Sequence, residues 1–187
     1  MKCENCTRTV TPFELIDENA IVPTECDISE LRSLLGYFQY RAPNIDALKS
    51  QMLDVALHNS VLSEMIDTNR FEYKFCSQNA DAQVEFEKLN LKGETICSWC
   101  KRFVCKLKNQ SKRDKTRKET NLESLLRHLR NSIAHGRVYV IHGGTFITIL
   151  FVDINTNGNE SARIVCRQSD LKKWRSILNK ALNSQGT

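Results

Sequence analysis

The chain has 187 residues, of which 41% are apolar and 26% are charged, and its net charge is +5. This composition is sufficient for the core of one domain, or of one domain with an appended subdomain. The first residues lack the apolar segment of a secretory signal, and the longest uncharged run, 138–152, is interrupted by two glycines. We therefore expect a soluble, cytoplasmic protein without a membrane span.

Apolar residues recur at helical spacing through most of the chain before residue 137. Such spacing predicts a helix at 27–38, a long one from 45 to about 67, one or two at 80–107, and a last one at 120–136. These ranges, taken together, indicate a helical bundle over residues 27–136.

The pattern then changes to that of β-structure. Residues 138–142 and 145–152 indicate two strands joined at Gly143-Gly144, and 162–167 a third, before a final helix beginning near residue 169. The fold class expected is therefore mainly α: the bundle, then a small antiparallel β meander and a C-terminal helix at 137–187 that pack on it. The sequence assigns no role to residues 1–26.

The 120–136 helix carries the most informative residues. Its apolar stripe consists of Leu122, Leu125, Leu126, Leu129 and Ile133. His128 and His135 lie nearly over one another opposite this stripe, with Asn131 between them and Arg127 alongside, while Arg130 lies nearer the apolar edge. Gly136 is expected to end the helix. This face is a candidate site for chemistry on phosphate.

The segment Leu-Arg-Asn-Ser-Ile-Ala-His-Gly-Arg, residues 129–137, resembles the HEPN family. The hallmark of that family is an Arg, a polar residue and, a few residues later, a His near the end of the last helix of a bundle; Arg130, Asn131 and His135 match it. The resemblance implies a homodimer that brings two motifs into one cleft. It also implies a metal-independent ribonuclease of a toxin or antiviral defence system, with an antitoxin or regulator as a further partner.

This hypothesis gives each motif residue a role in RNA cleavage by 2′-hydroxyl attack, without a cofactor. His135 would transfer protons, Arg130 would stabilise the phosphate charge, and Asn131 would orient the histidine or contact phosphate. His128 and Arg127 are possible auxiliary residues, for which a structural role is the stronger interpretation. The main alternative is a non-catalytic dimeric HEPN-like module that binds nucleotide or protein, so the sequence favours an enzyme without establishing one.

A basic segment lies before this helix. Residues 101–118 contain nine Lys or Arg and one Asp, a local charge of +8, so the rest of the chain carries −3. It would contact RNA through phosphate neutralisation, or else form a solvated loop. The candidate RNA-binding residues are Lys112, Arg113, Lys115, Arg117 and Lys118.

The eight cysteines indicate free thiols in a reducing compartment. They include two CxxC pairs, Cys3 with Cys6 and Cys97 with Cys100, which could in principle make a four-thiolate zinc site. The long gap between the pairs disfavours that site, and Cys100 falls at helical spacing with apolar neighbours, as a core residue would. A zinc-stabilised nucleic-acid binder is therefore the third hypothesis.

Overall fold

The computed structural model describes residues 28–67, 70–92, 97, 99–142 and 146–185. The elements in chain order are α1 (Ser29–Tyr40), the short 3₁₀ helix η2 (Val55–Leu57), α2 (His58–Met65), β1 (Phe71–Cys76), α3 (Asn79–Lys88), β2 (Lys101–Lys106), α4 (Asn121–Ala134), β3 (Val138–His142), β4 (Ile147–Ile154), β5 (Glu160–Arg167) and α5 (Gln168–Asn183). None of the helices in these residues has the length and apolar character needed to cross a membrane.

The five strands form one mixed sheet in the order β1-β2-β5-β4-β3. β1 and β2 are parallel, which requires a crossover connection, and α3 lies in that connection. The other pairs are antiparallel, with Phe103 of β2 opposite Ile164 of β5 and Ile164 opposite Phe151 of β4. Because β2 pairs with β5, strands from before and after α4 belong to the same sheet.

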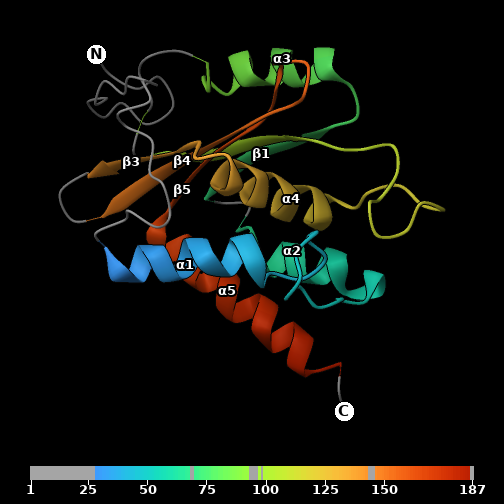
Figure 1. Ribbon diagram of the computed structural model, residues 1–187. Helices are drawn as coiled ribbons and strands as arrows, with labels where there is room; N and C mark the ends of the chain where they lie inside the picture. The colour runs from blue at the N-terminus through green and yellow to red at the C-terminus, as the bar shows by residue number, and fades with distance from the viewer. Residues whose placement is uncertain (1–27, 68–69, 93–96, 98, 143–145, 186–187) are drawn as a thin grey trace.

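Helices cover both faces of this sheet (Figure 1). Helix α3 covers one face, where Phe86 packs with Val104 and Val165. The helices α1, α2, α4 and α5 cover the other, and their apolar residues form the larger core with sheet residues such as Phe103 and Ile164. Successive residues of a strand point to opposite faces, so the apolar run in β2 serves both cores.

The expected mainly α class, with a bundle followed by a small meander, is wrong. The fold is an α/β/α arrangement around a five-stranded mixed sheet, and two of its strands, β1 and β2, precede α4. β2 occupies Lys101–Lys106, inside the 80–107 range that helical spacing assigned to helices. A strand buried on both faces reads as a continuous apolar run, and a short run of this kind also fits a helical period.

The long helix expected from residue 45 is also shorter. Residues 42–54 form turns, and helical structure begins only at η2, where the Asp54 side chain accepts a hydrogen bond from the Ala56 amide at 3.0 Å. Leu48 and Met52, which the periodicity placed in the core, are exposed. By contrast, the three strands predicted after residue 137 are confirmed as β3, β4 and β5, although β4 begins at Ile147 and residue 145 lies outside the described residues.

Candidate functional site

Helix α4, which carries the motif, is fixed at both ends. At its start the Thr120 hydroxyl accepts a hydrogen bond from the Glu123 amide at 3.2 Å, and the Glu123 carboxylate accepts one from the Thr120 amide at 2.9 Å. This reciprocal pair is a capping box. At its end Gly136 has φ +65°, and the Arg137 amide donates to the Ser132 carbonyl at 2.8 Å. The expected helix end at Gly136 is confirmed.

One face of α4 lines a polar cavity of 440 Å³. The cavity lies between this face, the residues after β2 and the β4–β5 hairpin. From α4 and its cap it is lined by Arg127, His128, Asn131 and His135. The His135 side chain is exposed at the C-cap position, so its ring is accessible from this cavity.

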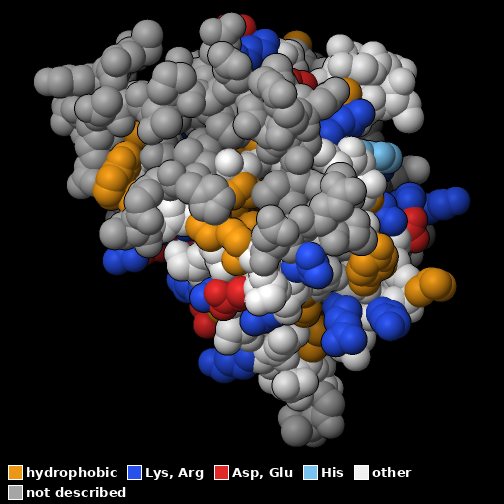
Figure 2. All heavy atoms as spheres, turned by 60° about the vertical axis from the view of Figure 1, so that its left-hand side comes forward, with side chains coloured by type: hydrophobic (Ala, Val, Ile, Leu, Met, Phe, Trp, Pro, Cys, Tyr) orange, Lys and Arg blue, Asp and Glu red, His pale blue; other side chains and the backbone are white. Residues whose placement is uncertain are grey.

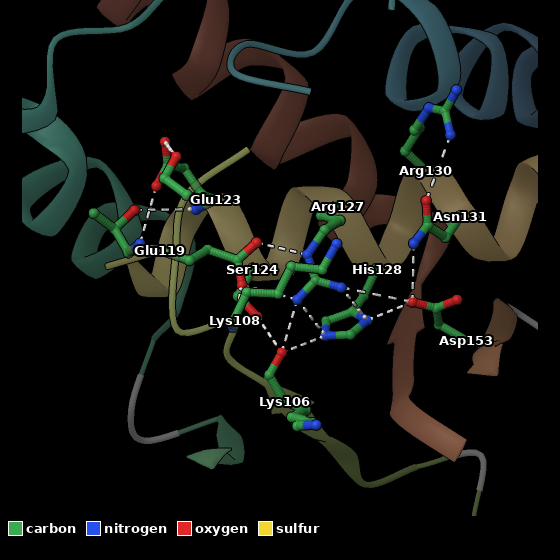
Figure 3. A network of polar contacts seen from close by, with 12 residues as sticks. Lys106, Lys108, Glu119, Glu123, Ser124, Arg127, His128, Arg130, Asn131 and Asp153 are labelled. Carbon is green, nitrogen blue, oxygen red and sulfur yellow. Dashed lines mark hydrogen bonds and ion pairs between the residues drawn. The ribbon is translucent and has the colours of Figure 1, made fainter. Parts of the chain in front are cut away.

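A buried hydrogen-bond network underlies the cavity (Figure 3). The His128 ring is fully buried, with Nδ1 2.6 Å from the Asp153 carboxylate and Nε2 2.8 Å from the Lys106 carbonyl oxygen. The Asn131 amide nitrogen donates to the same Asp153 oxygen at 3.1 Å. Asp153 on β4 thus joins two motif-face residues to the sheet.

Burial and charge set the protonation of this network. Burial and the neighbouring Arg127 guanidinium lower the pKa of His128, while its contacts with Asp153 and Lys106 oppose that shift. Burial raises the pKa of the Asp153 carboxyl, but hydrogen bonds from His128 and Asn131 outweigh it and hold the pKa below its usual range. The Asp153 carboxylate is therefore ionised and accepts a hydrogen bond from Nδ1 of His128, whose pKa lies below its usual value.

Arg127 is held by a second buried acid. Its guanidinium makes two contacts with the Glu119 carboxylate, at 2.6 and 2.8 Å, and donates to the Lys106 carbonyl at 2.8 Å. Glu119 also accepts from the Lys108 amide at 2.8 Å. These contacts tie α4 to the segment after β2. They agree with the structural interpretation of Arg127 and His128, which the sequence favoured over an auxiliary role.

Arg130 lies on the opposite side of Asn131. Figure 3 shows its side chain pointing away from His128 and Asp153, with Nη1 3.4 Å from the Asn131 side-chain oxygen. It lines a second and larger cavity, next to α1 and α5. Residues five apart on a helix are about 140° apart around its axis. Within one protomer, therefore, Arg130 and His135 open into different cavities.

The predicted RNA-binding residues differ in their surroundings. The Lys112 side chain pairs with Asp46, and the Arg113 side chain donates to the Ile45 carbonyl. Arg117 makes two contacts with the buried Glu123 carboxylate, at 2.8 and 2.6 Å. Three of the five basic side chains thus attach the segment before α4 to neighbouring residues. Lys115 and Lys118 are exposed to solvent.

Of the four cysteines in the zinc hypothesis, the structure describes Cys97 and Cys100. Cys3 and Cys6 lie outside the described residues, whereas Cys97 is buried and Cys100 is half-buried. Neither is helical, so the helical interpretation of Cys100 is wrong. Among the residues that the structure describes, no group of three or more His, Cys, Asp or Glu side chains could hold a metal ion.

Sequence reasoning missed two acidic residues of the site, Glu119 and Asp153. Asp153 had a visible signal, because it is a charged residue near the end of an otherwise apolar run, 146–154. Buried charges are normally paired, so such a residue implies a partner from another element. Glu119 gave no comparable signal, since it follows a run of lysines and arginines that suggested solvent exposure.

The protein is thus an α/β protein with helices on both faces of one mixed sheet. Helix α4, which carries the His and Arg of the motif, packs on that sheet beside the polar cavity. A family model described as HEPN pEK499 p136 matches residues 31–185. The chain therefore belongs to this HEPN family, which confirms the family suggested by the 129–137 segment. No curated protein and no solved structure matches the chain.

Proposed function

We propose that this protein is a metal-independent endoribonuclease of the HEPN type, acting as a toxin or antiviral defence effector. The observation that carries the proposal is the placement of the motif. His135 is exposed at a polar cavity, while Asn131, held by Asp153, directs its side-chain oxygen toward Arg130. RNA cleavage by 2′-hydroxyl attack requires proton transfer and charge stabilisation, which a histidine and an arginine supply.

Each motif residue has a physical role in this proposal. His135 accepts the proton of the attacking hydroxyl or protonates the leaving oxygen, since imidazole does both near neutral pH. Arg130 holds the phosphate oxygens with a planar guanidinium that stays charged. Asn131 is a positioning residue: its amide nitrogen is committed to Asp153, so its oxygen faces Arg130. Lys106 and Lys108 at the same cavity attract the RNA backbone.

A second copy of the chain would complete the site. Arg130 and His135 line different cavities of one protomer, so a composite site would combine Arg130 of one chain with His135 of the other. Two-fold dimers use the same surface on both copies and so present every motif residue twice. The proposed partners are RNA, a second copy of the chain, and a cognate antitoxin or regulator.

The same separation favours a second candidate function. If no second copy brings Arg130 and His135 together, each cavity can still bind a phosphorylated ligand or a protein without turnover. The protein would then be a non-catalytic HEPN module, as some members of the family are.

Cleavage of labelled RNA in EDTA separates these two functions. We expect wild type to cut RNA, and Arg130→Ala and His135→Ala each to lower the rate by about 10² to 10⁴-fold. Arg70→Ala is the matched control, since Arg70 is exposed and pairs with Asp67 far from α4 in sequence. If wild type cuts no RNA, or if His135→Ala cuts at the wild-type rate, the enzyme proposal fails and the binding module replaces it.

A further inference from the structure

A second large cavity lies beside α1, the turn segment that follows it, and α5. Its volume is 1790 Å³, above the range of about 300–1,000 Å³ that is usual for small-molecule pockets. Its basic lining residues are Arg41, Lys49, Arg113, Arg130 and Arg175. Among the described residues that line it, Asp46 is the single acid, and Asp46 is already paired with Lys112. We call it the arginine cavity.

Two residues that line this cavity have a buried donor atom for which the described residues supply no acceptor. Tyr37 is 9% exposed, and its buried hydroxyl has no hydrogen-bond partner among the described residues. Burial raises the pKa of Tyr37 to about 12 although Arg175 lowers it, so the hydroxyl keeps its proton. The Nε atom of Arg130 is also buried, and it too lacks a partner in the part of the chain that the structure describes. A buried donor left unpaired is costly, and an anion is the kind of ligand that could pair with both side chains.

The arginines around these donors also have few hydrogen-bond acceptors among the described residues. Arg175 reaches the Ser33 hydroxyl at 3.3 Å, and Arg113 donates to the Ile45 carbonyl, which leaves other guanidinium donors of both arginines available. Tyr40, at the end of α1, is 54% exposed on the cavity lining and presents an aromatic ring to solvent. On the described part of the face drawn in Figure 2, Lys and Arg side chains are more prominent than Asp and Glu side chains.

We infer that the arginine cavity binds the stretch of single-stranded RNA adjoining the bond that is cut. Arg130 belongs both to the cavity and to the proposed catalytic set, so a strand held at the scissile phosphate continues into it. Arg41, Arg175 and the Tyr37 hydroxyl bind backbone phosphates, and Tyr40 stacks on a base. This inference rests on the proposed function and adds to it the recognition of several consecutive nucleotides.

RNA fits the cavity better than the other anions that arginines bind. A mononucleotide would occupy only part of 1790 Å³ and leave several cations unpaired. An acidic peptide has no base to stack on Tyr40. A single strand supplies both regularly spaced phosphates and aromatic rings, which is the combination that non-specific RNA sites use.

Binding is measured by fluorescence anisotropy of a labelled single-stranded RNA, in a His135→Ala background that leaves the RNA intact. We expect Arg41→Ala and Arg175→Ala each to weaken binding about tenfold, and Tyr37→Phe about fivefold. Tyr40→Ala should weaken it about tenfold through lost stacking. Each arginine variant should also reduce the slope of log affinity against log salt by about 0.7. Arg70→Ala is the matched control and should bind as the background does.

Competition then distinguishes the sources of the anion. An unlabelled oligonucleotide should displace the labelled RNA at far lower concentration than uridine monophosphate, inorganic phosphate or polyglutamate. If any of these three competes as well as the oligonucleotide, the assignment to RNA is overturned. Melting temperatures of all variants should match the background, and Tyr37→Phe keeps the ring that packs in the fold.

Failure of this inference is separable from failure of the proposed function. If wild type cuts RNA while Arg41→Ala and Arg175→Ala keep the wild-type KM and RNA affinity, the arginine cavity is not the RNA path, and the ribonuclease proposal stands. If no RNA is cut but these variants lose RNA binding, the cavity assignment stands and the catalytic proposal fails.

Discussion

The two cavities on either side of Asn131 differ in how their polar groups are satisfied. Beside His128, the buried acids and bases are matched: His128 and Asn131 with Asp153, and Arg127 with Glu119. At the arginine cavity, Tyr37 and Arg130 each keep a buried donor atom that pairs with none of the described residues. Satisfied networks stabilise a fold, whereas a buried donor beside a cavity can gain its partner from a ligand.

This difference distinguishes the residues that hold helix α4 in place from the motif residues that we propose act on RNA. Asp153 and Glu119 fix one face of α4 against the sheet, so their loss should destabilise the protein. Arg130 and His135, at the borders of the two cavities, should be dispensable for folding. The substitutions below test that separation, from the largest expected effect to the smallest.

Replacing Asp153 by Ala should have the largest effect on stability. It leaves the His128 ring and the Asn131 amide without their buried acceptor, and breaking a buried charged pair costs about 3–5 kcal/mol. Asp153→Asn, which keeps an acceptor oxygen, should lose less. Urea unfolding measures both variants. A free energy of unfolding equal to that of wild type for Asp153→Ala would show that the network does not hold α4.

Leu129→Ala should also destabilise the protein, by about 2–5 kcal/mol, because Leu129 is fully buried in the larger core. Arg130→Ala, one residue further along, should change the free energy of unfolding by no more than about 0.5 kcal/mol. Paired urea titrations of these two variants test the separation between core and cavity. Equal losses of stability would contradict it.

The basic segment before α4 should also contain both structural residues and residues that contact RNA. Arg117→Ser should cost about 1–3 kcal/mol, since it leaves the buried Glu123 carboxylate without its two contacts. Lys115→Ser with Lys118→Ser should change stability by less than about 0.5 kcal/mol. That double variant should instead flatten the salt dependence of RNA binding, by about 0.7 in slope per lost phosphate contact. An unchanged slope would assign both lysines to a solvated loop.

Acidification should lower stability in a defined window. The folded-state pKa of His128 lies below its unfolded value, so the unfolded chain takes up a proton first as pH falls below about 6.5. His58, whose pKa burial also lowers, acts in the same direction. Asp153 adds a further loss below about pH 4, where the unfolded carboxyl protonates first. Urea midpoints should therefore fall between pH 7.5 and 5. If an NMR titration showed His128 as an imidazolium at pH 7, the loss of stability expected from this residue on acidification would be contradicted.

Sequence periodicity located the motif helix well and the sheet only in part. The stripe from Leu122 to Ile133 is buried, and Asn131 and His135 share a cavity as their spacing required. β1 and β2 were missed because strand pairing joins residues about 30 and 60 positions apart, such as Phe71 with Lys101 and Arg102 with Val165. Local spacing carries no information on those partners. For the same reason Asp153, which lies on β4, could not be assigned to His128 from sequence alone.

Complementation between inactive variants tests the central claim, a site shared by two chains, most directly. Arg130→Ala and His135→Ala proteins, each expected to have little activity alone, are mixed under conditions that exchange subunits. A mixed dimer keeps one site with an intact Arg130 from one chain and an intact His135 from the other. We expect the mixture to regain RNA cleavage in EDTA, up to about one active site per mixed dimer. A mixture that stays inactive, although mass spectrometry shows that mixed dimers have formed, would contradict the shared site.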